Sequence, residues 1–157
     1  GNTLSTSAAT GNASLSNATS TSTATQLAVS NTSISGPADY DQTAADGNVN
    51  TSGNKTFNIT SASGNTTITF VKVSGTTQVN PQFAVTNDGS TPTSFQNSGT
   101  TSTKSASSSI IVRTRFTGDS SLAGQTGVYR ITVTNNSISD TVDVSLVTFD
   151  EGGFGGP

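Results

Sequence analysis

Eight asparagines in this sequence stand in the triplet Asn-x-Ser/Thr, whose side-chain amide can accept an N-linked glycan in a secreted protein. They are Asn12, Asn17, Asn31, Asn50, Asn54, Asn58, Asn65 and Asn135. Three of them fall within residues 54–70, NKTFNITSASGNTTITF. Some triplets arise by chance in a chain with 56 Ser and Thr and 14 Asn. Their density between 54 and 70 nevertheless predicts an extracellular protein that carries sugar on its surface.

Catalytic chemistry has few residues to draw on. The chain has no His and no Cys, which excludes Ser-His-Asp and Cys-His catalysis and the usual zinc sites. A glycosidase needs two carboxyl groups facing each other in a cleft, but all nine acids fall in expected loops, strand ends or polar strand faces. With no Trp and two Tyr, a sugar-stacking cleft is also not expected. We expect no enzymatic activity, no catalytic residue and no cofactor.

Three acids lie close together in sequence, at Asp39, Asp41 and Asp46. Their spacing is loosely like that of a calcium loop, but the glutamate that ends an EF-hand loop is missing. We interpret them as solvated loop acids and predict no metal site. A weak Ca²⁺ site is the alternative.

The six cations are scattered along the chain, whereas phosphate binding needs clustered Lys and Arg. We therefore expect no nucleic-acid partner. Lys72 shares strand parity with Ile68 and Phe70, which would place it on the core-facing side of its strand. We expect its long side chain to reach water from the end of the strand. A Lys–Asn or Lys–Asp isopeptide cross-link is the alternative. Arg113 and Arg115 are expected on a solvated or interface face.

Composition bounds the fold. Of 157 residues, 29% are hydrophobic and 10% are charged, and the net charge is −3. The low hydrophobic content predicts a thin core, and the low charge predicts a surface whose polar groups are mainly hydroxyls and amides. No apolar run approaches the length of a transmembrane helix. Recurrent alternation of apolar and polar residues predicts strands, and no helical periodicity competes with it. The expected strands are 25–35, 55–61, 66–74, 77–86, 109–117, 127–135 and 140–149.

These strands predict an all-β fold, an antiparallel Ig-like or pilin-like β-sandwich over residues 24–150. The inward positions include Phe57, Ile59, Tyr129, Ile131 and Val133. Residues 36–48 and most of 89–109 are expected to be loop, 63–65 a hairpin turn, and Pro81 an edge or bulge. Residues 151–157, EGGFGGP, are expected to be a flexible Gly-rich C-terminus whose Phe154 is either frayed or a small anchor.

The N-terminal segment 1–23, GNTLSTSAATGNASLSNATSTST, is too poor in apolar residues to fold alone. It is either a disordered or O-glycosylated stalk, or a strand that orders against a partner. In the second interpretation Leu4, Thr6 and Ala8 share one face, as β-strand addition requires. Residues 1–23 are therefore a candidate donor strand.

In its organisation, the chain resembles the thread filament subunits of thermoacidophilic archaea. The resemblance rests on the Ser/Thr/Asn-rich tail followed by a cysteine-free, sequon-rich sandwich with strands such as TTITFVKVS and SIIVRTRFT. It implies a glycosylated cell-surface filament of identical subunits, in which each tail completes the next sandwich by donor-strand complementation, in adhesion or biofilm formation. A tail that meets a groove is a heterologous contact and would propagate as an open fibre. The alternative is a stand-alone extracellular adhesin or S-layer-associated Ig-like module on a Ser/Thr-rich stalk.

Overall fold

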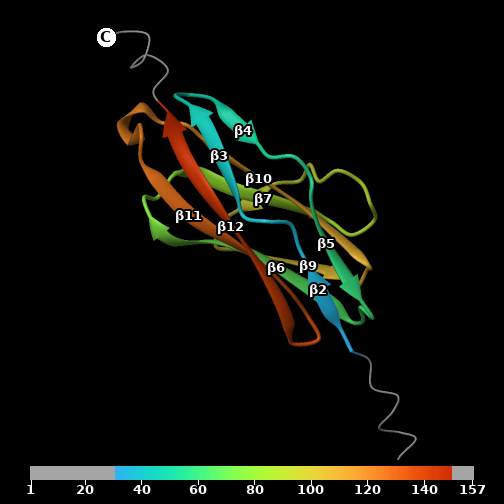
Figure 1. Ribbon diagram of the computed structural model, residues 1–157. Coiled ribbons are helices and arrows are strands. Elements are labelled where there is room, and N and C mark those ends of the chain that lie inside the picture. Colours follow the sequence, from blue (N-terminus) through green and yellow to red (C-terminus); the bar gives the residue numbers. More distant parts are fainter. Residues whose placement is uncertain (1–30, 150–157) are drawn as a thin grey trace, which may run out of the picture. The chain divides into compact units, whose positions relative to one another are not determined.

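The computed structural model describes residues 31–149 (Figure 1). The candidate donor residues Leu4, Thr6 and Ala8, the sequons Asn12 and Asn17, and the C-terminal segment 151–157 lie outside that range. Within it almost every element is a strand. No helix among residues 31–149 is long and apolar enough to cross a membrane.

The strands form two sheets. The first is a six-stranded sheet with the order β2-β5-β10-β7-β8, in which β4 also pairs with β10. Its strands are β2 (Ser33–Ser35), β4 (Val49–Thr51), β5 (Lys55–Thr60), β7 (Val79–Thr86), β8 (Gln96–Asn97) and β10 (Ser109–Thr117). The second is a five-stranded sheet with the order β3-β12-β11-β6-β9. Its strands are β3 (Tyr40–Ala45), β6 (Asn65–Gly75), β9 (Thr101–Ser105), β11 (Thr126–Asn135) and β12 (Ile138–Phe149), and a short 3₁₀ helix, η1 (Ser120–Leu122), precedes β11.

One hydrophobic core lies between the two sheets, which confirms the predicted all-β, Ig-like class. The first sheet contributes Phe57, Ile59, Phe83 and Val112, and the second contributes Ile68, Phe70, Tyr129, Ile131, Val133 and Val144, among others. Most of these side chains are fully buried because every second residue of each strand points inward. The predicted inward positions of β5 and β11 are confirmed.

Two segments predicted as loop contain strands instead. Within 36–48, β3 pairs with β12 in the parallel direction, so the sandwich is not wholly antiparallel. Within 89–109, β9 pairs with β6 as an edge strand. Both were missed because their inward residues are small or polar. In β3 these include Gln42 and Ala44, and in β9 Ser102.

The predicted hairpin at residues 63–65 is wrong. β5 belongs to the first sheet and β6 to the second, so the turn between them carries the chain across the sandwich instead of pairing neighbours. Alternation within a strand shows which face is apolar, but it does not show which sheet the strand joins. The turn needs left-handed backbone at Ser61 and Gly64, whose φ angles are 58° and 69°.

The structure agrees with the expectations for Pro81 and Lys72. Pro81 lies where the β7–β10 register shifts, next to Asn80 with a φ of 50°, so it occupies a bulge that needs no ladder N–H. Lys72 is exposed near the end of β6, where a further register shift lies. Its Nζ donates to the carbonyl oxygen of Gly75 at 3.0 Å and to Thr77 Oγ1 at 2.9 Å.

Buried glutamines tie the two sheets together. Gln78, 3% exposed, donates from Nε2 to the carbonyl oxygens of Gln125 and Leu146 at 2.9 and 3.1 Å, and accepts from Thr148 Oγ1 at 3.0 Å. Gln42, 4% exposed, accepts from Thr114 Oγ1 at 2.8 Å. These glutamine hydrogen bonds join the two sheets in addition to the contacts of the thin apolar core.

Candidate functional site

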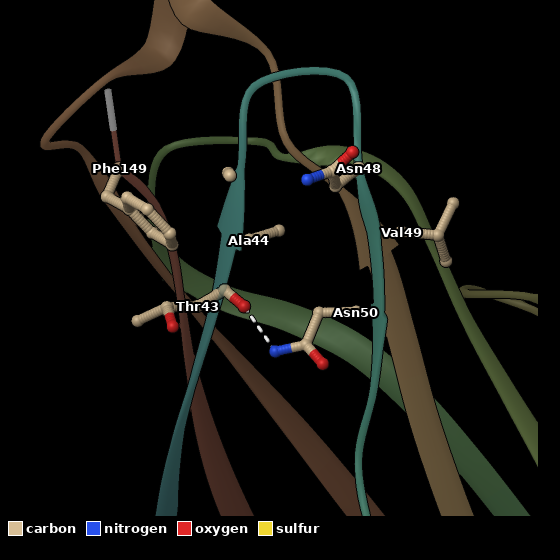
Figure 2. Close-up of a pocket in the computed structure, with 7 residues that line it drawn as sticks. Thr43, Ala44, Asn48, Val49, Asn50 and Phe149 are labelled. Atoms are coloured by element: carbon tan, nitrogen blue, oxygen red, sulfur yellow. Dashed lines mark hydrogen bonds between the residues drawn. The ribbon is translucent and has the colours of Figure 1, made fainter. Parts of the chain in front are cut away.

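An open slot lies at one end of the sandwich, where β3 and β4 face each other (Figure 2). It has a volume of about 320 Å³ and is lined by Thr43, Ala44, Ala45, Asn48, Val49, Asn50 and Phe149. Val49 and Phe149 are among the few large apolar side chains that the described residues expose, at 58% and 39%. The slot therefore offers apolar contact on a surface that is otherwise mostly polar.

The two strands that border the slot belong to different sheets and are bridged mainly by side chains. β3 pairs with β12 and β4 with β10. Across the gap, Asn50 Nδ2 donates to the carbonyl oxygen of Thr43, as drawn in Figure 2, and Gln42 Nε2 donates to the carbonyl oxygen of Asn50 at 2.8 Å. Among residues 31–149, each of these two strands has one edge that joins no backbone ladder. Such an edge can accept another extended segment.

Four sequons of the described range lie on the surface and are open to modification. Asn31, Asn54, Asn58 and Asn65 are all exposed. Asn58 lies on the outer face of β5, between Ser35 of β2 and Ser109 of β10. Asn54 Nδ2 donates to Thr91 Oγ1 at 3.1 Å across an exposed contact. A glycan on any of these four would extend into solvent.

Asn135, a candidate glycosylation site by its triplet, differs from the other sequons of the described range. Its side chain is 1% exposed. The amide nitrogen donates to the carbonyl oxygens of Ser63 and Asn65 at 3.0 and 3.3 Å and to Thr66 Oγ1 at 3.0 Å. The sequence carried the signal, because continuing the inward parity of Tyr129, Ile131 and Val133 by two residues reaches Asn135.

Asn50 is exposed but lies inside the slot. Its amide nitrogen bridges to β3, so a sugar there would displace the bridge and occupy the slot. Asn50 is therefore both a sequon and part of the lining of the slot.

The three neighbouring acids do not gather into a metal site. Asp39 Oδ1 accepts from the backbone N–H of Asp143 at 2.9 Å, Asp41 is exposed on β3, and Asp46 Oδ1 accepts from the backbone N–H of Ser120 at 2.8 Å. Within residues 31–149 no group of three or more His, Cys, Asp or Glu side chains could hold a metal ion. Asp39 and Asp46 instead satisfy backbone donors.

The two arginines of β10 lie on the outer face of the first sheet, half-buried beneath the chain between β7 and β9. Arg113 donates to the carbonyl oxygens of Ser52 and Pro92 at 3.1 and 3.0 Å. Arg115 donates to Gln82 Oε1 at 2.8 Å, and its guanidinium lies 4.0 Å from the centre of the Phe95 ring. The two arginines were predicted to lie on a solvated or interface face. In the structure they contact the chain between β7 and β9 and hold it against the sheet.

One ion pair lies on the outer face of the second sheet. Arg130 Nε and Nη2 donate to the two carboxylate oxygens of Asp143 at 2.7 and 3.1 Å. The hydrogen bond from Arg130 lowers the pKa of Asp143, and the carboxylate in turn raises the pKa of Arg130. Both side chains remain about a third or more exposed, so the pair is worth little.

Comparison with known proteins leaves the family open. No family model and no curated protein matches the chain. Among solved structures, a family 123 glycoside hydrolase from Clostridium perfringens aligns over 76% of this chain, with 11% identity and a TM-score of 0.45, and this chain spans 28% of its length. The N-terminal domain of PorA aligns over 75% of this chain and 97% of its own, with 9% identity and a TM-score of 0.30. Likenesses this distant carry no argument about function.

Proposed function

We propose that this protein is a structural subunit of an extracellular, N-glycosylated surface filament. Copies join head to tail when residues 1–23 of one copy add as an extended strand to the β3–β4 slot of the next. The observation that carries the proposal is the slot itself. It combines the exposed side chains of Val49 and Phe149 with two strand edges that are unpaired within the described part of the chain.

The tail and the slot are chemically matched. Leu4, Thr6 and Ala8 would present small and apolar side chains on one face, and the apolar lining of the slot includes Ala44 and Val49. The backbone of an added strand would provide the hydrogen bonds that side chains now supply across the gap. Because tail and slot are different surfaces, the contact leaves a free slot at one end and a free tail at the other.

The remaining surface suits a glycosylated fibre. The exposed sequons Asn54, Asn58 and Asn65 lie on or beside β5 and β6, and none of them lines the slot. Sugars there would shield the fibre from proteases and from lateral clumping without covering the contact. Adhesion or biofilm formation is the role that such a fibre would serve.

Electron microscopy of the full chain and of a chain lacking residues 1–23 tests the assembly. The full chain is expected to form thin, unbranched fibres that repeat once per domain, and the shortened chain to stay folded and monomeric. Circular dichroism of the shortened chain provides the folding control. Fibres without the tail would refute strand addition. A full chain that never assembles would favour the stand-alone adhesin or S-layer module, with residues 1–23 as its stalk.

Disulfide trapping tests the position of the contact, since the natural chain has no cysteine. Ala8→Cys in the tail combined with Asn48→Cys in the slot should give a ladder of disulfide-linked oligomers under mild oxidation. The matched control joins Ala8→Cys with Thr103→Cys on β9, which is the strand at the opposite edge of the second sheet as the described residues form it. If the control cross-links and the slot pair does not, the tail docks on β9 and the slot assignment is wrong.

Glycopeptide mass spectrometry of the native protein tests the surface assignment. We expect sugar at Asn58 and Asn65, and none at Asn135, because its amide is buried and bonded. Asn50 should be unmodified in assembled material, since a sugar there would fill the slot. A glycan found on Asn50 in intact fibres would contradict docking at this position.

A further inference from the structure

We propose that the parallel β3–β12 ladder is a shear clamp, which gives the domain high resistance to tension applied along its length. The inference concerns a load-bearing function of the single domain. Resistance to tension would be useful in the proposed filament, and in this sense the inference rests on the proposed function. The strands and hydrogen bonds that form the clamp all lie within residues 31–149.

The described chain enters and leaves the sandwich at opposite ends. Asn136, in the turn between β11 and β12, donates from Nδ2 to Thr32 Oγ1 at 2.9 Å, so the chain enters beside the start of β12. It leaves at Phe149, the last residue of β12. The 12 residues of β12 therefore separate the two points by about 40 Å. Figure 1 shows β2 and the end of β12 at opposite ends of the sandwich.

The first and last long strands are each other's neighbours. β3 pairs with β12 over six residues, from Tyr40 opposite Val144 to Ala45 opposite Phe149. Both strands run in the same direction, so tension pulls β3 toward its start and β12 toward its end. The two strands must slide past each other, and all the hydrogen bonds between them are stretched together. In an unzipping geometry the same bonds would break one after another.

Side chains lengthen and brace this ladder. The carboxylate of Asp39 accepts from the backbone N–H of Asp143 at 2.9 Å, which adds one bond before the first backbone pair. The Tyr40 hydroxyl bonds to Thr114 Oγ1 at 2.7 Å, and Gln42 Nε2 donates to the carbonyl oxygen of Thr114 at 2.9 Å. β3 is thus held to the first sheet as well as to β12.

The far end of β3 is also fixed. The backbone N–H of Gly47 donates to the carbonyl oxygen of Gly118 at 2.9 Å, and that of Gly118 donates to the carbonyl oxygen of Asn48 at 2.9 Å. By contrast, β2 pairs over three residues, so it can peel away early without releasing β3. The resistance to tension is therefore concentrated in the β3–β12 pair.

Single-molecule force spectroscopy of the full chain in two pulling geometries tests the clamp. In the first, force is applied through the two termini, between marker domains of known unfolding force. Unfolding of the 119 residues from 31 to 149 should release about 390 Å of chain, and it should require high force. In the second, handles at Ala38→Cys and Thr141→Cys pull at the same end of the ladder and should unzip it. Both positions are exposed, so matched melting temperatures serve as the folding control.

We expect a several-fold higher unfolding force through the termini than through the two cysteines. Equal forces, or a lower force through the termini, would overturn the clamp. As a second measurement, Asp39→Ala should lower the force through the termini because it removes the acceptor for Asp143, whereas Asp88→Ala in an exposed turn should leave it unchanged. The proposals fail separately. A monomeric chain with a strong clamp would refute only the filament, and fibres with equal pulling forces would refute only the clamp.

Discussion

Replacing Gln78 by Leu tests whether buried amides, as much as apolar packing, hold the two sheets together. The Gln78 side chain is 3% exposed and makes three hydrogen bonds, to the carbonyl oxygens of Gln125 and Leu146 and to the Thr148 hydroxyl. Leucine has a similar volume, so the change removes the bonds without leaving a large cavity. At about 1 kcal/mol for each bond, the free energy of unfolding should fall by about 3 kcal/mol. The melting temperature should fall by roughly 10 °C.

Urea unfolding followed by circular dichroism measures this loss, and an unchanged m-value would show that the unfolded state is not altered. The matched control is Gln96→Leu, because that amide makes an exposed bond to Thr100 Oγ1 at 2.8 Å. It should change stability by less than about 0.5 kcal/mol. Thr148→Val completes a double-mutant cycle with Gln78→Leu, and we expect a measurable coupling. If Gln78→Leu costs no more than the control, the amide cross-link contributes nothing and the reasoning is wrong.

Two further predictions concern backbone approach and acid. Gly118→Ala should lower the free energy of unfolding by about 1–3 kcal/mol, because its new methyl group would overlap the carbonyl oxygen of Ala45. The control Gly53→Ala meets nothing within 4 Å and should be neutral or slightly stabilising, so similar losses in thermal melts would refute the steric argument. The lowered pKa of Asp143 adds stability above about pH 4 that is lost as pH falls through the folded pKa. Asp143→Asn should remove that part of the acid dependence, less than about 1 kcal/mol between pH 6 and pH 2 in urea titrations, whereas an unchanged profile would mean that the ion pair with Arg130 is not formed in solution.

The sequence was most informative where strand alternation involves large apolar residues. In β11 and β12 most of the inward residues are aromatic or branched, so the pattern alone indicated the inward face and the approximate bounds of each strand. β3 was missed because Gln42 lies inward, and its burial depends on partners that come from distant strands. β9 contains no apolar side chain at all, and its strand conformation follows from pairing with β6.

The candidate sites were predictable to different degrees. A sequon is a local pattern, so all eight asparagines could be found in the sequence, but whether each is exposed depends on tertiary structure. Asn135 shows the difference, since its buried amide holds the turn at Ser63 in place. The slot could not be predicted, because it forms between strands of two sheets and the sequence does not specify sheet membership.

The β11–β12 hairpin and the β3–β12 ladder place very different demands on folding. β11 and β12 pair over ten positions across a two-residue turn, Asn136-Ser137, whose φ angles of 52° and 65° suit the right-handed twist of a hairpin. These contacts are local and can form early. β3 meets β12 across 104 residues of chain, as Asp39 meets Asp143, and closing so long a loop costs entropy before any contact compensates for it. We therefore expect the clamp to be the last pairing completed, so a newly synthesised chain gains its full strength only when folding ends.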